Sequence, residues 1–181
     1  MSQFTIAAAY KWPDIDNKEK TTNSELATKF ITNSLQKRFD NKNNKKIDVK
    51  FDVVYKRLRA SAGKTMLDSI IKRIETANVV IVDISKLTAN VFLELGIALY
   101  VSKKQNLSVY IIKEKVNGDE LLKDLPSDLQ GYFISTYVIN NGLPTFKDNN
   151  SLLMSIVSDI NDHYQIGGDF FEKTDEINFD N

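Results

Sequence analysis

The feature that most constrains the fold is a repeated change from strand-like to helix-like spacing of apolar residues. The segment NVVIVDI, residues 78–84, is a continuous run of mostly β-branched side chains, which is typical of a central strand in a parallel sheet. Further strands are predicted at residues 3–10, 47–55, 107–113 and 133–140. Helices are predicted between them, at residues 22–39, 65–77, 90–104 and around 153–160.

This alternation predicts an α/β protein whose sheet is mostly parallel, because parallel neighbours are joined by crossover helices. We expect a flavodoxin-like (Rossmann-like) three-layer sandwich, with helices on both faces of the sheet. At 181 residues the chain is long enough for one domain with a hydrophobic core and too short for two ordinary ones. That domain is assigned to residues 1–166. The tail, 167–181, holds five acidic residues against one lysine and is expected either to be disordered or to dock on a partner.

The composition excludes several classes of function. The 24 basic and 24 acidic residues balance, so the charge gives no sign of nucleic-acid binding. The absence of cysteine rules out disulfides, zinc–thiolate sites and cysteine nucleophiles. No apolar run approaches the roughly 20 residues that span a bilayer, and the first residues do not resemble a secretory signal. We expect a cytoplasmic protein with no membrane contact, no metal site and no cofactor.

Ligands of open parallel sheets bind beyond the carboxyl ends of the strands, so the loops that follow the strands are the places to search. The segment SAGKT, residues 61–65, is not a P-loop, because Leu58 stands where that motif requires its first glycine. Ser61, Gly63 and the N–H groups of the next helix would suit a phosphate, but a basic solvated loop is an equally good interpretation. Asp83 ends the central strand, where a carboxylate either orients a ligand hydroxyl or caps the next loop.

The segment NVFLELGIALYV, residues 90–101, places a glutamate within an apolar helix. At 100° per residue, Asn90 lies on the same face as Glu94, and apolar residues occupy nearly every direction, so the helix is predicted to be buried. A buried glutamate costs several kcal/mol unless it is paired, hydrogen-bonded or protonated. Glu94 is therefore either functional, or paired with Lys64 or Arg57, or placed at a rim that water reaches.

The segment IETANVVIVDISKLTANVFLELGIALYVSKKQ, residues 74–105, resembles the core of the nucleoside 2-deoxyribosyltransferase-like family and of the related TIR-like nucleotide-binding domains. The specific part is a strand ending in Asp-Ile-Ser followed by N-V-x-x-E-L-G-x-A. The resemblance implies a flavodoxin-like fold. In the transferases the glutamate of this helix attacks the anomeric carbon of the sugar, and TIR enzymes that cleave NAD use a helical glutamate at the nicotinamide ribose. The corresponding residue here is Glu94.

The resemblance implies further roles. Asp68 matches the transferase aspartate that protonates the leaving base, although Thr65 and Asp68 also have the spacing of a capping box. An aromatic side chain after the first strand would stack on the base, and Asn90 would bind the ribose hydroxyls or hold the carboxylate. Gly96 would allow close approach of the helix to another element. The expected substrate-binding residues are Tyr10, Trp12, Ser61, Gly63, Asp83, Ser85 and Asn90.

Cleavage of an N-glycosidic bond needs a carboxylate at the anomeric carbon and an acid near the base, a pair that Glu94 and Asp68 would supply. We expect hydrolysis or transfer at the glycosidic bond of a nucleotide, nucleoside or NAD, which the resemblance links to bacterial antiphage effectors. Thr88 stands where the transferases carry a further carboxylate, so hydrolysis and transfer both stay open. The alternatives are a non-catalytic nucleotide-sensing module and a TIR-like module that associates with itself or with a partner protein.

Overall fold

The computed structural model describes residues 2–11, 21–43, 51–58, 65–86, 88–116, 129, 131–147 and 149–164. The elements in chain order are β1 (Ser2–Ala9), α1 (Asn23–Asn43), β2 (Phe51–Arg57), α2 (Met66–Glu75), β3 (Val79–Asp83), α3 (Ala89–Ser102), β4 (Ser108–Glu114), β5 (Ile134–Asn140), β6 (Leu143–Phe146) and α4 (Asn149–Tyr164). Strand and helix alternate from β1 to β4, which confirms the predicted α/β class.

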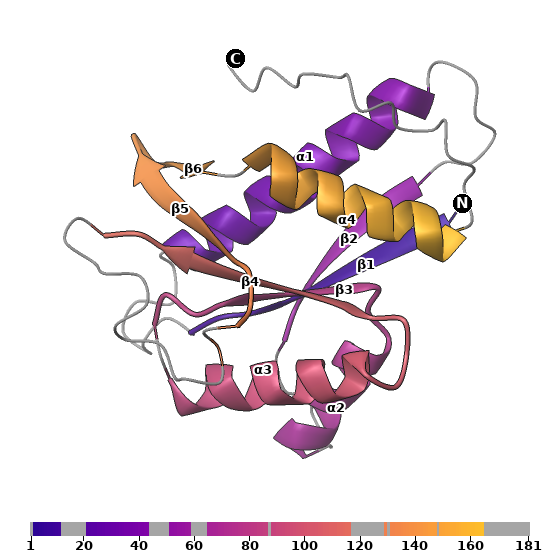
Figure 1. The fold of residues 1–181 in the computed structure, drawn as a ribbon, viewed down its shortest axis with the longest axis vertical. Coiled ribbons are helices and arrows are strands. Elements are labelled where there is room, and N and C mark those ends of the chain that lie inside the picture. The colour runs from indigo at the N-terminus through magenta and orange to yellow at the C-terminus, as the bar shows by residue number, and fades with distance from the viewer. Residues whose placement is uncertain are drawn as a thin grey trace.

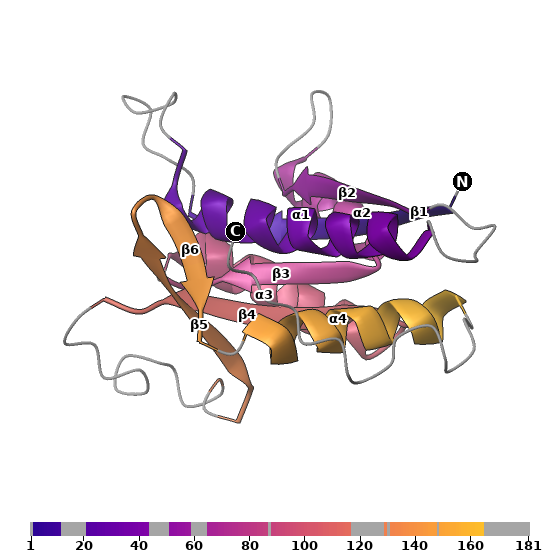
Figure 2. The same cartoon turned by 90° about the horizontal axis from the view of Figure 1, so that it is seen from above.

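The strands form one six-stranded sheet in the order β2-β1-β3-β4-β5-β6. The first five strands of this order are parallel, and β6 runs antiparallel to β5. The sheet curls, because β5 and β6 turn away from the direction of the other strands (Figure 2). Ala8 pairs with Arg57, and Ala9 pairs with Val82, so β1, β2 and β3 end at the same edge. Side chains that follow these strands therefore meet at one carboxyl edge.

Helices cover both faces of the sheet. In Figure 1, α1 and α4 lie on one face, and α2 and α3 lie on the other. Each face has its own apolar core, because successive strand residues point to opposite sides. In β3, Ile81 packs in the core that includes Ile31 of α1 and Ile156 of α4, whereas Val80 packs in the core that includes Leu95 of α3. Burial of each such side chain stabilises the fold by about 1.5–3 kcal/mol.

The predicted elements differ from the observed ones mainly after β4. The segment 134–140 is a strand, as predicted, but β6 was not expected. Asn141 and Gly142 join the two strands with φ angles of 50° and 79°, a left-handed pair that fits a two-residue hairpin turn. Asn-Gly is a strong hairpin signal, so the sequence contained the information for this strand.

No helix in the described ranges is long and apolar enough to cross a membrane. The acidic tail, 167–181, lies outside the described residues, and the prediction for it stays open.

Candidate active site

Glu94 lies in α3 close to the carboxyl edge of the sheet. β3 ends at Asp83, and α3 begins six residues later at Ala89. Thr88 is its N-cap, and the Thr88 side chain accepts a hydrogen bond from the Val91 N–H at 3.4 Å. Glu94 is therefore one and a half turns into the helix. The side of α3 that faces the sheet carries Val91, Leu95 and Ala98, and Glu94 is buried with them at 5% exposure.

Burial dominates the electrostatics of Glu94. Loss of solvent raises the pKa of the Glu94 carboxyl to about 7, and the positive charge of Arg57 moves this pKa in the opposite direction. A carboxyl with this pKa exists in both protonation states near neutral pH. Its ionised form can therefore act as a nucleophile or a base near neutral pH.

Arg57 ends β2 and is held from two sides. Its guanidinium carbon lies 4.5 Å from the centre of the Tyr10 ring, a cation–π contact. Its backbone carbonyl accepts a hydrogen bond from Arg73 Nη1 of α2 at 2.7 Å. The Nε and Nη2 atoms of Arg57 are buried. The sequence suggested Arg57 as one of two partners of Glu94, and the structure places the charge of Arg57 where it acts on Glu94.

Tyr10 directly follows β1 and is almost fully buried. Its hydroxyl shares a 2.8 Å hydrogen bond with the hydroxyl of Tyr55 from β2, and burial raises the pKa of both phenols. Because Arg57 covers one face of the Tyr10 ring, a nucleobase that stacked on Tyr10 would need the other face or would displace Arg57. Tyr55 was not anticipated, since nothing local in the sequence links it to a residue 45 positions away.

Asp83 and Ser85 form a second buried cluster at the same edge. Asp83, 1% exposed, accepts hydrogen bonds from the Ser85 N–H at 2.7 Å, the Ser85 hydroxyl, and the Tyr137 hydroxyl at 2.6 Å. Burial raises the pKa of Asp83, while these bonds and one with Ser24 of α1 favour its charged form. Ser85 Oγ also accepts the Glu114 N–H at 2.6 Å. These contacts match the interpretation of Asp83 as a cap of its loop, and its role towards a ligand stays a prediction.

The two other polar residues predicted at the site are exposed. Asp68 lies in the first turn of α2, where its N–H donates to Thr65 Oγ1 at 3.1 Å and its carboxylate accepts from the Thr65 hydroxyl. This is the capping arrangement that its spacing also predicted. Asn90 lies in the first turn of α3 and is exposed although Glu94, one turn later, is buried. The proposed proton transfer from Asp68 and the ribose contact of Asn90 both stay predictions.

Three residues of the predicted site, Trp12, Ser61 and Gly63, lie outside the described residues. Within the described ranges there is no group of three or more His, Asp or Glu side chains that could hold a metal ion. A hollow lies between α2 and α3, and none of the predicted site residues lines it.

Two findings correct the predictions for α3. The helix is not buried on all sides, because one row of helices on each face of the sheet can cover only one side of each helix; Leu93 and Tyr100 face outward, with 52% and 59% exposure. Gly96 also faces outward, and a Cβ added there would meet no heavy atom within 4 Å. The predicted close approach at Gly96 is therefore not made by any of the residues that the structure describes.

Protein-family models and curated proteins were compared with the chain, and none of them matches it. What the protein does is therefore inferred from the chemistry of the residues at the carboxyl edge. The Glu94 carboxyl has a pKa of about 7, and the Arg57 guanidinium lies on the ring of Tyr10. The Tyr10 hydroxyl is hydrogen-bonded to that of Tyr55, and Asp83 accepts hydrogen bonds from its neighbours.

Proposed function

We propose that this protein hydrolyses the N-glycosidic bond of NAD or a related nucleotide, with Glu94 as the nucleophile. The observation that carries the proposal is the Glu94 carboxyl itself, buried at the carboxyl edge of the sheet with a pKa of about 7. A glutamate is tolerated in such a place at a cost in stability, and such perturbed groups concentrate at functional sites.

The proposed fold supports this location. The strand order from β2 to β5 is that of flavodoxin-like sheets, and helices on both faces would make it a three-layer sandwich. β1 leads to α1 on one face, and β3 leads to α3 on the other. The connections that follow these two neighbouring strands therefore leave the sheet towards opposite faces. Ligands of this fold class bind at that point. Tyr10 follows β1 and Glu94 follows β3, so the two flank it.

The reaction would proceed in two steps. A Glu94 carboxylate oxygen bonds to C1′ of the nicotinamide ribose while the C1′–N bond breaks. The electron pair of the broken bond neutralises the pyridinium ring, which leaves as nicotinamide. Water then attacks C1′, the C1′–O bond to Glu94 breaks, and the water proton passes to solvent or to the carboxylate. Ionised Glu94 is required for the first step, and Arg57 favours this form.

NAD is the preferred substrate class because its leaving group departs without a proton. A purine or pyrimidine base needs an acid near the departing nitrogen. The candidate acid, Asp68, is exposed and engaged in capping α2. Thr88, where the transferases have a carboxylate, is the N-cap of α3. Both features favour a hydrolase for a charged base over a deoxyribosyltransferase. Trp12, Ser61, Gly63, Ser85 and Asn90 remain the proposed contacts to the rest of the nucleotide.

The test is release of nicotinamide from NAD, followed by chromatography beside a panel of nucleosides and nucleotides. We expect release by the wild type and a loss of more than about 1,000-fold in Glu94→Gln. Glu75→Gln, an exposed glutamate of α2, is the matched control and should keep wild-type activity. NAD binding without cleavage by any variant would instead support the nucleotide-sensing alternative, and activity that survives Glu94→Gln would exclude the assigned nucleophile.

A further inference from the structure

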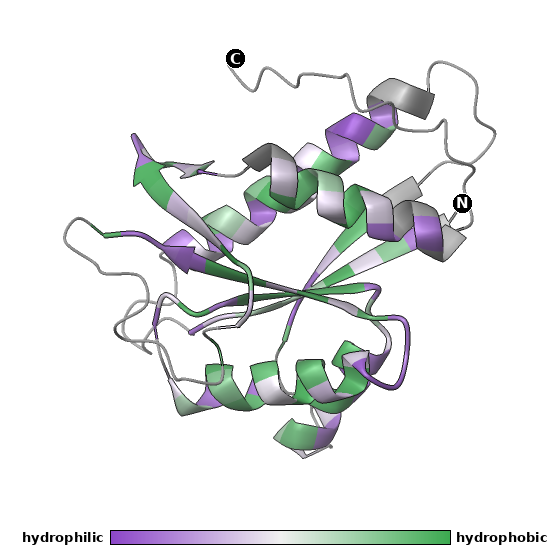
Figure 3. Ribbon diagram, viewed as in Figure 1, coloured by the Kyte–Doolittle hydropathy of each residue, from purple (hydrophilic) through white to green (hydrophobic). Residues whose placement is uncertain are grey.

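Lys113, near the carboxyl end of β4, is a buried lysine that the proposed reaction does not use. It is 5% exposed, although lysine is almost never fully buried without a partner. Its ammonium group makes no hydrogen bond or ion pair with any residue that the structure describes. In Figure 3 the ribbon of β4 changes from hydrophobic to hydrophilic at this end. Because a buried charge costs free energy unless it is paired, the position of Lys113 points to an anionic ligand.

Strand geometry directs the Lys113 side chain to the face of the sheet that α3 covers. Successive residues of a strand point to opposite faces, and Ile111, two residues earlier, packs in the same core as Leu95 of α3. Glu114 points to the other face, where its carboxylate accepts a hydrogen bond from Asn23 of α1 at 2.7 Å. Lys113 therefore lies on the α3 side.

The register of the sheet places Lys113 and the amino terminus of α3 at the same end of this face. Asp83 pairs with Ile112, and the Ile84 N–H donates to the Ile112 carbonyl at 2.9 Å. Lys113 is therefore level with the first residue after β3. α3 begins at Ala89, at the same carboxyl edge, and runs back along the sheet (Figure 1).

The first turn of α3 has N–H groups to offer an anion. The Val91 N–H is bonded to Thr88 Oγ1, and the Phe92 N–H is bonded to the Thr88 carbonyl. The N–H groups of Ala89 and Asn90 have no hydrogen bond within the part of the chain that the structure describes. Both residues are exposed, and the turn contains no acidic side chain that would compete with a ligand. Such a helix terminus attracts anions, and phosphate fits it well.

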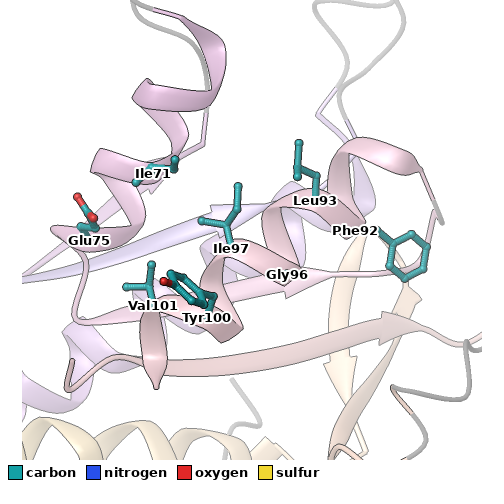
Figure 4. A pocket seen from close by; sticks show the side chains of 8 residues that line it. All are labelled: Ile71, Glu75, Phe92, Leu93, Gly96, Ile97, Tyr100 and Val101. Carbon is teal, nitrogen blue, oxygen red and sulfur yellow. The ribbon is translucent and has the colours of Figure 1, made fainter. Parts of the chain in front are cut away.

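Other places near this end of the molecule suit an anion less well. Arg57 lies on the ring of Tyr10 and acts on Glu94, so its charge is already engaged. The hollow between α2 and α3 is lined mostly by apolar side chains and by the carboxylate of Glu75, which would repel an anion (Figure 4). Lys113 and the first turn of α3 are therefore the best candidate for an anion site.

We propose that Lys113 and the first turn of α3 bind the 5′-phosphate of the ribose that Glu94 attacks. The phosphate is placed relative to Glu94, so this site rests on the proposed function. Glu94 is six residues after Thr88, about 9 Å along the helix axis, and helical side chains lean towards the amino terminus. A ribose whose C1′ carbon meets the Glu94 carboxylate can therefore place its 5′-phosphate at the first turn of α3, beside Lys113.

Two ligands that differ only in this phosphate test the site. Nicotinamide mononucleotide carries the 5′-phosphate, and nicotinamide riboside lacks it. Isothermal titration calorimetry of the full chain with Glu94→Gln measures the affinity for both without cleavage. The mononucleotide should bind at least about tenfold more tightly, because a hydrogen bond between charged groups contributes this much, and adding Lys113→Met should remove most of the difference. Lys103→Met removes an exposed lysine at the other end of α3 and is the matched control, which should keep the difference.

Three results would overturn the proposal. These are equal affinity for the two ligands, a difference that survives Lys113→Met, and a difference that Lys103→Met removes equally. Failure of the proposed function is a separate outcome, in which the mononucleotide binds through Lys113 but the wild type releases no nicotinamide from NAD. If neither ligand binds, both proposals are wrong.

Thermal unfolding followed by circular dichroism separates binding from a structural role of Lys113. Methionine keeps an unbranched side chain of similar length and removes a buried charge, so Lys113→Met should unfold at the wild-type temperature or higher. A clearly lower unfolding temperature would identify a lysine that stabilises the fold and would overturn the proposal.

Discussion

Replacing Glu94 with glutamine should make the protein more stable at alkaline pH. Glutamine has nearly the same shape but carries no charge, so the substitution removes the cost of a buried carboxylate and little else. The Glu94 pKa rises from an ordinary value of 4.5 to about 7 on folding. Between these two pH values the folded protein holds a proton that the unfolded chain has released, so the contribution of Glu94 to stability falls as the pH rises.

The size of the effect follows from the shift. The change from 4.5 to about 7 corresponds to about 3 kcal/mol, and solvent near the carboxyl edge screens part of it, which leaves about 2 kcal/mol. Urea unfolding of the wild type and Glu94→Gln at pH values near 4.5 and above 7 measures it. The two proteins should be similar in acid, and Glu94→Gln should be about 2 kcal/mol more stable in alkali. Glu75→Gln should show no such difference.

A decrease in stability would refute this reasoning. If Glu94 were held in a buried ion pair with Arg57, its neutralisation would leave Arg57 without compensation and would cost about 3–5 kcal/mol. Destabilisation of Glu94→Gln above pH 7 would therefore identify a structural glutamate. Equal stability at both pH values would show that the carboxyl is solvated.

Three further substitutions test other residues of the candidate site and its surroundings. Arg57→Met removes the charge that favours ionised Glu94, so the Glu94 pKa, followed by carbon-13 NMR of the side-chain carboxyl, should rise above 7; an unchanged pKa would exclude the electrostatic role of Arg57. Tyr137→Phe removes a donor to buried Asp83 and should lower the free energy of unfolding by about 1–3 kcal/mol in urea; an unchanged value would mean that water replaces the hydroxyl. Asp68→Asn should retain nicotinamide release, because nicotinamide leaves without a proton, whereas a loss of about 100-fold or more would show that Asp68 takes part in the reaction in another role.

The sequence predicted the fold well where apolar spacing is strong. Residues 78–84 identified β3, and the helical stripes identified the main helices, because each pattern is local. β6 was missed although Asn141 and Gly142 carry a hairpin signal, since the strand itself has only four residues and begins with Leu143 and Pro144. The outward side of α3 was judged buried because composition alone does not tell which apolar side of a helix faces the sheet.

The candidate site was predictable only in part. Glu94 could be found because a carboxylate in an apolar helix is visible in the sequence. Tyr55 and Tyr137 could not, because their partners, Tyr10 and Asp83, lie 45 and 54 residues away and meet them only through the sheet. The capping contact of Asp68 was among the predicted alternatives, because a helix cap is a local arrangement.

The rate of nicotinamide release from NAD as a function of pH tests the central claim most directly. If ionised Glu94 attacks the ribose, kcat/KM should rise with pH and reach half of its maximum near pH 7, and Glu94→Gln should abolish release at every pH. A rate that does not change between acid and alkaline pH, or release by Glu94→Gln at the wild-type rate, would contradict the account.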